Sequence, residues 1–416
     1  MPSTPTQVID RLTCQWDDEA ANLVTSHENF GEVARHVEEE ASDAESPILA
    51  EYTAAGGGDE TLKAMTNFSA PELDALWALV EPAVTIAWTQ GRGRKPSISG
   101  GKDALFVTLT VLKHFDTWQK HAIDFNIGMS TLEKMVHRGI RTIEPVLYPQ
   151  LVARVTMAKQ MGSGNAFSNY PHALYATDVK FQPAYRPSGR FTEKVYFSAK
   201  HKLYGFKVEC SVAPPGLAVD VSDNSPGSCS DVTMMLDRMT VHRQMLRKED
   251  TSGPEMGGEP TQFPDMWAVL VDKGYQGAGR VLRTIQPKKK PRGGTLDRDD
   301  LAWNRAVSSD RVLVENSFGR MCMIWKATNA TFKWNENRFD SVGRLCTALT
   351  NFHVGLMPLR ARDSDHYDMV LAKYQSMGDR VRTQRARAQR HYRMRQQLRS
   401  PSAPYTTRPS ASQRET

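Results

Sequence analysis

The sequence contains no long apolar run. No stretch of about 18 consecutive apolar residues occurs, which is the length a membrane-spanning helix needs. The first thirty residues also lack the basic start and following apolar stretch of a secretory signal. We therefore expect a soluble, intracellular protein with no membrane partner.

Cysteine is scarce, and the five cysteines stand alone. None belongs to a Cys-x-x-Cys pair, a spacing typical of structural zinc sites. Isolated cysteines also argue against a disulfide framework and fit a reducing compartment. The residues are Cys14, Cys210, Cys229, Cys322 and Cys346.

Each end of the chain has very little charge of one sign. Residues 1–60 hold fourteen acidic residues against two arginines, whereas residues 379–399 hold eight arginines against one aspartate. The net charge is +6, so the remaining chain is basic as well. This distribution indicates a polyanionic partner, with nucleic acid favoured over a membrane surface because the tail lacks large apolar residues. Ordinary solvated charge is the alternative.

A chain of 416 residues, 40% of them hydrophobic, is too long for one compact domain and can bury a sizeable core. Residues 1–66 form an acidic leader, which we expect to be partly helical and partly disordered. Residues 67–160 form a helical region, which begins with a capping box at Ser69–Glu72. Residues 359–416 form a basic tail, which we expect to be largely disordered.

The helical region contains a helix-turn-helix pattern. A short helix over Trp118–Phe125 is followed by a turn at Asn126–Met129 and a second capping box at Ser130–Glu133. Plain helical scaffolding explains this pattern equally well. Nearby basic residues favour DNA contact, and they are Arg92, Arg94, Lys95, Arg138 and Arg141.

From about residue 170 the pattern changes to short runs rich in β-branched and aromatic residues, typical of strands. The continuous apolar run Trp267–Val271 predicts a central strand buried on both faces. Helical periodicity follows over Thr295–Lys326. The predicted fold class is therefore mixed α/β, with the second domain at residues 170–358.

Three carboxylates stand where a site could form. Asp178 and Asp272 each follow an apolar run, at the strand end where α/β sheets present ligand-binding side chains. Taken singly, an aspartate there is more often a turn former. Glu315 lies within the last helix, four residues after Arg311, so a helix ion pair is its alternative role. Together, the three could converge on divalent cations such as Mg²⁺ or Mn²⁺, and two such ions can cleave a phosphodiester.

At these residues the sequence resembles the Harbinger-type transposases and the nucleases derived from them. The resemblance spans roughly residues 170–355. It depends on the order and spacing of Ala176-Thr-Asp178, Lys200-His-Lys-Leu-Tyr-Gly205, Gly227-Ser-Cys-Ser-Asp231, Val271-Asp-Lys-Gly-Tyr275, Asn304 and Arg311-Val-Leu-Val-Glu315-Asn-Ser-Phe-Gly319. It implies a DDE catalytic domain of ribonuclease-H-like fold in which Asp178, Asp272 and Glu315 are the catalytic, metal-binding triad.

Other positions are secondary to that triad. Asp231 competes with Asp272 for the middle place, but it precedes a helix and fits a cap, so we expect Asp231 and Arg311 to lie just outside the triad. The sequence departs from the family at Val179-Lys180, where Gly-Thr is usual, and at Cys322, where lysine is common.

The sequence therefore predicts a DNA endonuclease or transposase that uses two divalent ions. A catalytically silent DNA-binding or adaptor protein is the alternative, and an RNA nuclease of the same fold is a third hypothesis. We expect a nuclear location, and the resemblance implies a separate Myb-like DNA-binding partner, while the sequence leaves oligomerisation open. A basic loop between the last two acidic motifs could contact phosphate or direct nuclear import, and its residues are Lys288, Lys289, Lys290 and Arg292.

Overall fold

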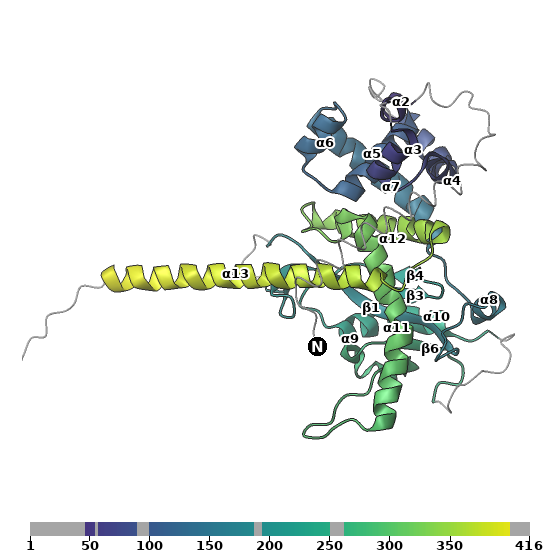
Figure 1. The fold of residues 1–416 in the computed structure, drawn as a ribbon, viewed down its shortest axis with the longest axis vertical. Helices are drawn as coiled ribbons and strands as arrows, with labels where there is room; N and C mark the ends of the chain where they lie inside the picture. The colour runs from purple at the N-terminus through teal and green to yellow at the C-terminus, as the bar shows by residue number, and fades with distance from the viewer. Residues whose placement is uncertain (1–45, 55–56, 90–99, 187–193, 250–261, 400–416) are drawn as a thin grey trace, which may run out of the picture.

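The computed structural model describes residues 46–54, 57–89, 100–186, 194–249 and 262–399 (Figure 1). A layer of helices lies at one end of the molecule, and a sheet with helices on both faces forms the rest. No helix among the described residues is long and apolar enough to cross a membrane. The mixed α/β prediction, with an N-terminal helical region, is confirmed.

The helical layer starts earlier than residue 67. Its helices are α2 (Pro47–Ala54), α3 (Gly58–Thr66), α4 (Ala70–Thr89), α5 (Gly101–His114), α6 (Trp118–Asp124) and α7 (Met129–Leu151). The next helix, α8 (Met157–Gly162), packs with the sheet instead, because its Met157 belongs to the same buried cluster as Leu174. Leu49 and Leu62 from the predicted leader are buried in the same core as α5. The Asp103 carboxylate accepts a hydrogen bond from the Leu49 backbone N–H at 3.0 Å, which ties α2 to α5. Residues 1–45 lie outside the described part.

Of the two predicted capping boxes, one forms. The Ser69 N–H donates to the Glu72 carboxylate at 2.8 Å, just before α4 begins. The box at Ser130 is wrong, because α7 already starts at Met129 and its N-cap is Gly128, with no side-chain bond. The predicted helix, turn and helix do occur as α6, residues 125–128 and α7.

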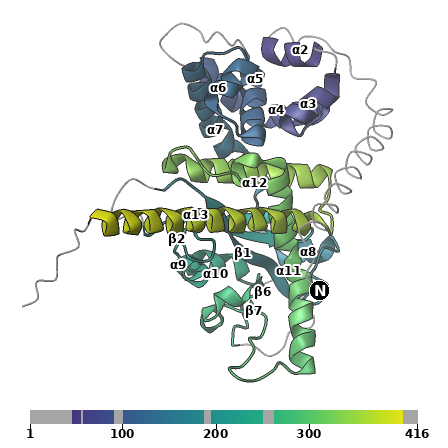
Figure 2. The ribbon, with the colours of Figure 1, turned by 60° about the vertical axis from the view of Figure 1, so that its left-hand side comes forward.

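The helical layer and the second domain share one core. Helix α12 (Phe339–Leu356) packs along α7 on one side and next to the sheet on the other (Figure 2). Its buried residues belong to the same cluster as those of α4, α5 and α7. The Trp118 and Trp334 rings stack at 5.0 Å across this junction. The two predicted parts are therefore not independent packing units.

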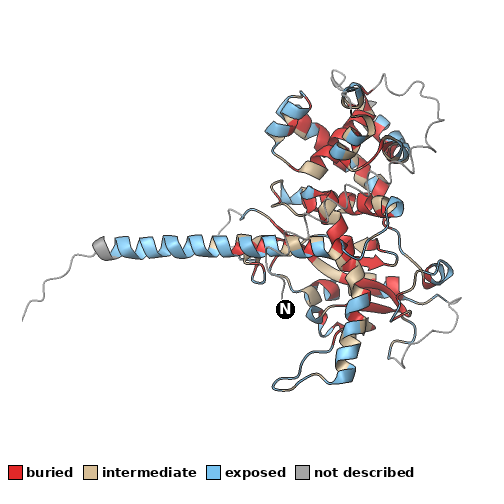
Figure 3. Cartoon of the chain, in the orientation of Figure 1, coloured by how far each residue is buried: buried red, intermediate tan, exposed pale blue. Residues whose placement is uncertain are grey.

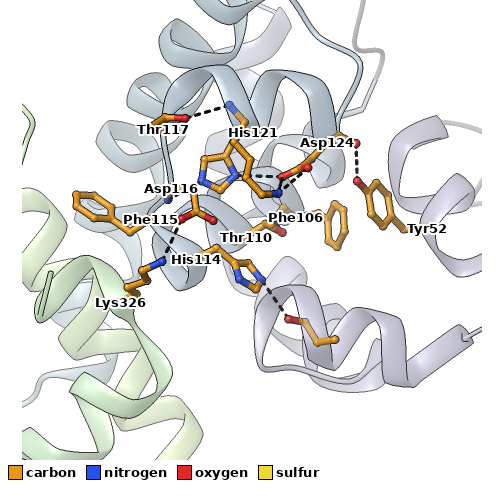
Figure 4. A network of polar contacts seen from close by, with 12 residues as sticks. Tyr52, Phe106, Thr110, His114, Phe115, Asp116, Thr117, His121, Asp124 and Lys326 are labelled. Carbon is orange, nitrogen blue, oxygen red and sulfur yellow. Dashed lines mark hydrogen bonds and ion pairs between the residues drawn. The ribbon is translucent and has the colours of Figure 1, made fainter. Parts of the chain in front are cut away.

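A polar network closes the junction beside α5 and α6 (Figure 4). The Lys326 ammonium, from the segment after α11, pairs with Asp116 at 3.0 Å. The Asp116 backbone N–H donates to His121 at 3.1 Å, and the Tyr52 hydroxyl donates to the Asp124 carbonyl at 2.6 Å. Burial lowers the pKa of His121 to about 4, so this ring is a neutral acceptor.

The sheet is built around its longest strands. The strands are β1 (Ala173–Pro183), β2 (Phe197–Ser198), β3 (Leu203–Ala213), β4 (Leu217–Val221), β5 (Ser225–Pro226), β6 (Ala268–Val271) and β7 (Thr284–Ile285). Their order is β2-β3-β1-β6-β7, and β4 and β5 also pair with β3. Strand β1 is antiparallel to β3 and parallel to β6, and β6 is parallel to β7. All four residues of β6 are buried, which confirms the predicted central strand.

Helices cover both faces of the sheet. Helix α11 (Arg298–Ile324) packs on one face, where Val314 and Phe318 belong to the same buried cluster as Ala176 of β1. Helices α9 (Asp231–Asp237) and α10 (Met239–Leu246) cover the other face beside Tyr175. The Asp297 side chain caps α11 by accepting from the Asp300 N–H at 2.7 Å.

The prediction of a largely disordered tail is wrong for residues 363–399. They form one helix, α13 (Asp363–Arg399), which packs on α11 and then extends away from the body (Figure 3). Apolar residues of its first half, including Tyr367, Val370 and Tyr374, are buried. The apolar contacts dock the first half of the helix, and good helix formers such as Arg, Gln and Ala continue it. Residues 400–416 lie outside the described part.

Candidate active site

Asp178 and Asp272 lie side by side on neighbouring parallel strands. Thr177 on β1 pairs with Val271, the last residue of β6, so the aspartate after each of them stands at the same level. Asp272 follows its strand, as predicted. Asp178 does not, because β1 continues to Pro183 and Asp178 pairs with Cys210 of β3. The strand β1 outlasts its parallel neighbour because the antiparallel ladder with β3 supports its second half.

Glu315 reaches the same place from α11. The Arg311 guanidinium donates to Asp178 Oδ2 at 2.9 Å and to Glu315 Oε1 at 2.6 Å. The predicted ion pair of Arg311 with Glu315 is thus present, and it extends across to the sheet. The exposed side-chain fractions are 21% for Asp178, 31% for Glu315 and 13% for Arg311, so the cluster is partly buried.

The electrostatics show that Asp272 belongs to this cluster. Burial, and to a smaller extent the charge of Asp272, raise the pKa of Asp178 to about 6 against the lowering effects of Arg311 and the Val179 N–H. Burial lowers the pKa of Arg311, but Asp178, Glu315 and Asp272 together outweigh burial and raise it. All three predicted carboxylates therefore act on one guanidinium.

The donor set suits a hard divalent cation, since it consists of carboxylate oxygens. As the side chains stand, no three His, Cys, Asp or Glu residues in the described part of the chain are grouped closely enough to hold a metal ion. The Arg311 guanidinium pairs with both Asp178 and Glu315 and so lies between these two carboxylates. The residue types fit a metal, and a side-chain rearrangement of Arg311 would have to precede its binding.

Asp231 lies next to the cluster but does not cap α9. The N-cap is Ser230, whose hydroxyl accepts from the Thr233 N–H at 3.2 Å. Asp231 instead pairs with Lys207 of β3 at 2.9 Å. A side chain at Gly274, two residues after Asp272, would come within 3.1 Å of the Asp231 carboxylate. Lys207 was not predicted from the sequence, because a lysine within an apolar strand does not indicate which residue it will contact.

The two departures from the family meet in space. Lys180 of β1 is buried and donates to the Thr328 carbonyl. Burial raises the pKa of the Cys322 thiol, and the nearby Lys180 ammonium lowers it. Position 322 therefore holds a cysteine in place of the lysine common in the family, but Lys180 of β1 lies beside it.

The residues predicted to contact DNA differ in their exposure and in their partners. Arg92, Arg94 and Lys95 lie outside the described residues. Arg138 stacks on the Trp88 ring at 5.0 Å and donates to the Ala87 carbonyl, whereas Arg141 is exposed. In the basic loop, Lys288 pairs with Asp300 at 2.6 Å and Lys289 bonds Gln276 at 2.7 Å, and both remain exposed together with Lys290 and Arg292.

Carboxylates on two sheet strands and a covering helix are the kind of side chains that metal-assisted cleavage of a phosphodiester uses. Residues 174–351 match the model of the DDE superfamily endonuclease family. The chain therefore carries a DDE superfamily endonuclease domain and is an enzyme of the nuclease and transposase class. Nucleases of this superfamily generally use divalent metal ions.

One curated relative supports the same class. It is a probable transposase for insertion sequence element IS702 from Microchaete diplosiphon, 22% identical over 266 residues. The similar region covers 63% of this chain and 86% of the relative. No solved structure matches this chain.

Proposed function

We propose that this protein is a metal-dependent DNA endonuclease of the transposase kind, with Asp178, Asp272 and Glu315 as its catalytic carboxylates. The observation that carries the proposal is that Asp178 and Glu315 share the Arg311 guanidinium, while Asp272 follows the neighbouring parallel strand at the level of Asp178. The sheet supports a ribonuclease-H-like fold, because β1 joins an antiparallel part formed with β3 and β4 to a parallel part formed with β6 and β7.

Asp178, Asp272 and Glu315 would hold Mg²⁺ or Mn²⁺ through their oxygen atoms. Bound there as a pair, such ions activate a water or a 3′-hydroxyl and stabilise the leaving oxygen of a phosphodiester. The chain itself fixes two of the carboxylates on adjacent strands and the third on a helix, so the site needs little backbone reorganisation. Arg311 would leave its position between Asp178 and Glu315 and could then contact a phosphate.

Lys207 and Asp231 would position the segment that carries Asp272. Their ion pair joins β3 to the start of α9, and Asp231 faces Gly274. Substituting Asp231 would therefore act through the Asp272 segment, whereas substituting Asp272 removes a metal ligand. We propose duplex DNA as the substrate because the relative is named a transposase. The nuclear location and the Myb-like partner stay predictions, and the relative comes from a bacterium.

Nicking of supercoiled plasmid tests the proposal. We expect cutting by the wild-type protein with Mg²⁺ or Mn²⁺, and loss of at least about 100-fold in the Asp178→Ala, Asp272→Asn and Glu315→Ala proteins. Asp237→Asn is a matched control, because Asp237 is an exposed carboxylate of α9. Equal cutting by the Asp272→Asn protein and the wild type would refute the triad.

Binding of the metal can be measured without activity. A ligand that binds only the folded state stabilises it, by about 2.7 kcal/mol when the ligand concentration is 100 times the dissociation constant. This stabilisation raises the melting temperature. We expect Mn²⁺ to raise the melting temperature of the wild type and to leave that of Asp272→Asn nearly unchanged.

A catalytically silent DNA-binding or adaptor protein is the second candidate. The observation that favours it is the position of Arg311, which supplies a permanent cation between two of the carboxylates. This candidate predicts that Mn²⁺ neither stabilises the protein nor supports nicking, while the protein still binds DNA.

A further inference from the structure

The second half of α13 is exposed over residues 382–396. The helix contacts the body at the turn between β2 and β3, where a Cβ on Gly378 would lie 2.5 Å from the His201 carbonyl oxygen. Asp379 pairs there with Lys202 at 3.2 Å, and Arg385 lies 5.9 Å from the Tyr204 ring centre. Every residue from 382 to 396 is exposed, and Figures 1 and 3 show this part of the helix standing away from the body.

The charge of this exposed half is of one sign. Residues 380–399 contain eight arginines and no aspartate or glutamate. Pairs of arginines three residues apart, such as Arg382 with Arg385 and Arg387 with Arg390, repel each other on a helix. Asp379 pairs with Arg382 at 3.4 Å, but residues 380–399 hold no carboxylate of their own, so an external polyanion would relieve the remaining repulsion.

The pattern of side chains excludes two other partners. Only alanines, Tyr392 and Met394 interrupt the polar residues from 382 to 396, so no apolar stripe is available for a coiled coil. The same lack of an apolar face excludes a helix lying in a membrane surface. Charge complementarity leaves a polyanion as the partner.

The arrangement of the arginines favours duplex DNA. Successive helix residues are turned by about 100°, so arginines at 380, 382, 385, 387, 390, 393 and 395 point to all sides of the helix. A helix is about 10–12 Å across, which matches the major groove of B-form DNA at about 12 Å. A helix in that groove has a phosphate backbone on each side, so arginines on opposite sides of α13 would all find a phosphate.

We propose that residues 380–399 of α13 bind duplex DNA through its phosphates, with the helix in the major groove. This inference rests on the proposed DNA substrate. The docked half of α13 runs beside Glu315, because the Ser364 N–H donates to the side chain of Asn316 at 2.8 Å, and Asp368 lies one turn further along α13. At 1.5 Å per residue, the exposed arginines lie about 20–40 Å along the helix from Asp368, so they hold DNA well away from the cleaved bond.

The test uses the full-length protein and a 30-bp DNA duplex in EDTA, with binding followed by fluorescence polarisation over a series of salt concentrations. One variant replaces Arg382, Arg387, Arg390 and Arg395 with glutamine, which has a similar helix propensity. Arg385 stays, because it contacts Tyr204. A second variant replaces the same four residues with lysine and keeps the charge, and circular dichroism verifies that both keep their helix content.

We expect the glutamine variant to bind the duplex at least about tenfold more weakly at 0.1 M salt, with a salt slope smaller by about 3, since each phosphate contact contributes about 0.9. The lysine variant should stay within about threefold of the wild type. An unchanged affinity and slope in the glutamine variant overturns the inference, and so does a loss confined to RNA. Because binding is measured in EDTA, a failure to nick DNA would count against the proposed function and not against this surface.

Discussion

The ion pair between Arg320 and Asp363 fixes the point at which α13 begins, and the Asp363→Asn substitution tests its contribution. The Arg320 guanidinium lies 2.8 Å from the Asp363 carboxylate, and the side chains are 2% and 0% exposed. Arg320 also donates to the carbonyls of Met357 at 2.7 Å and Pro358 at 3.1 Å. The pair therefore connects α11, the end of α12 and the start of α13.

Removing one partner of a buried ion pair costs about 3–5 kcal/mol, because the other charge stays buried. Asparagine keeps an acceptor for the Arg360 N–H, which Asp363 binds at 3.0 Å, so we expect the lower end, about 3 kcal/mol. With an unfolding entropy of about 2.1 cal/mol/K per residue, this corresponds to a melting temperature lower by about 3–4 °C.

Scanning calorimetry at pH 7 measures the effect, and Asp365→Asn is the matched control. Asp365 lies in the same first turn but is exposed, so its replacement removes the same charge without leaving a buried cation. We expect it to cost below about 1 kcal/mol, through the helix dipole alone. If the two variants lose the same stability, Arg320 does not depend on Asp363, and the assignment of this pair as the anchor of α13 is refuted.

Two further predictions concern packing and pH. Gly319→Ala should destabilise the protein by about 2 kcal/mol, because the added Cβ overlaps the Asp363 backbone carbonyl. Gly343→Ala, in open space on α12, should stabilise the protein through the higher helix propensity of alanine. Urea unfolding measures both changes in stability, and the same sign for both would contradict the packing described for Gly319. Burial lowers the pKa of His137 to about 4, so the folded state keeps this ring neutral while the unfolded chain takes up a proton below pH 6.5, and stability should fall as the pH drops from about 6.5 to about 4. The His137→Gln protein should lose less stability between pH 7 and pH 4.5 than the wild type, and an identical loss would count against a neutral buried ring.

Local sequence patterns were sufficient for the elements that carry two of the acids. The apolar run before Asp272 predicted a buried central strand, and helical periodicity around Glu315 predicted the helix that the structure has at residues 298–324. Both signals are local, since burial on two faces leaves a continuous apolar run and helix packing leaves a period of 3.6. The pairing of Arg311 with Glu315 was also predictable, because residues four apart on a helix are neighbours.

Features that depend on distant segments were not predictable. The extension of β1 beyond Asp178 depends on its ladder with β3, and polar residues such as Lys180 and Gln182 hide it in the sequence. The end of the predicted leader is held to the helical layer by the hydrogen bond between Leu49 and the distant Asp103. The helix over residues 363–399 was masked by its charge, because a run of arginines without acids is typical of disorder, whereas the buried contacts of Tyr367, Val370 and Tyr374 nucleate the helix.

The charge balance of the site connects the fold with the proposed chemistry. Asp178, Asp272 and Glu315 bring three negative charges to one place, and Arg311 compensates one of them. The raised pKa of Asp178 is the consequence of the charge that is left over and of burial. Replacing the single charge of Arg311 with divalent cations would neutralise the remainder, and a released Arg311 would face the phosphate. The same fold places the seven exposed arginines of residues 380–395 on the helix that packs on α11, so the acidic centre and the basic surface are held by one pair of helices, α11 and α13.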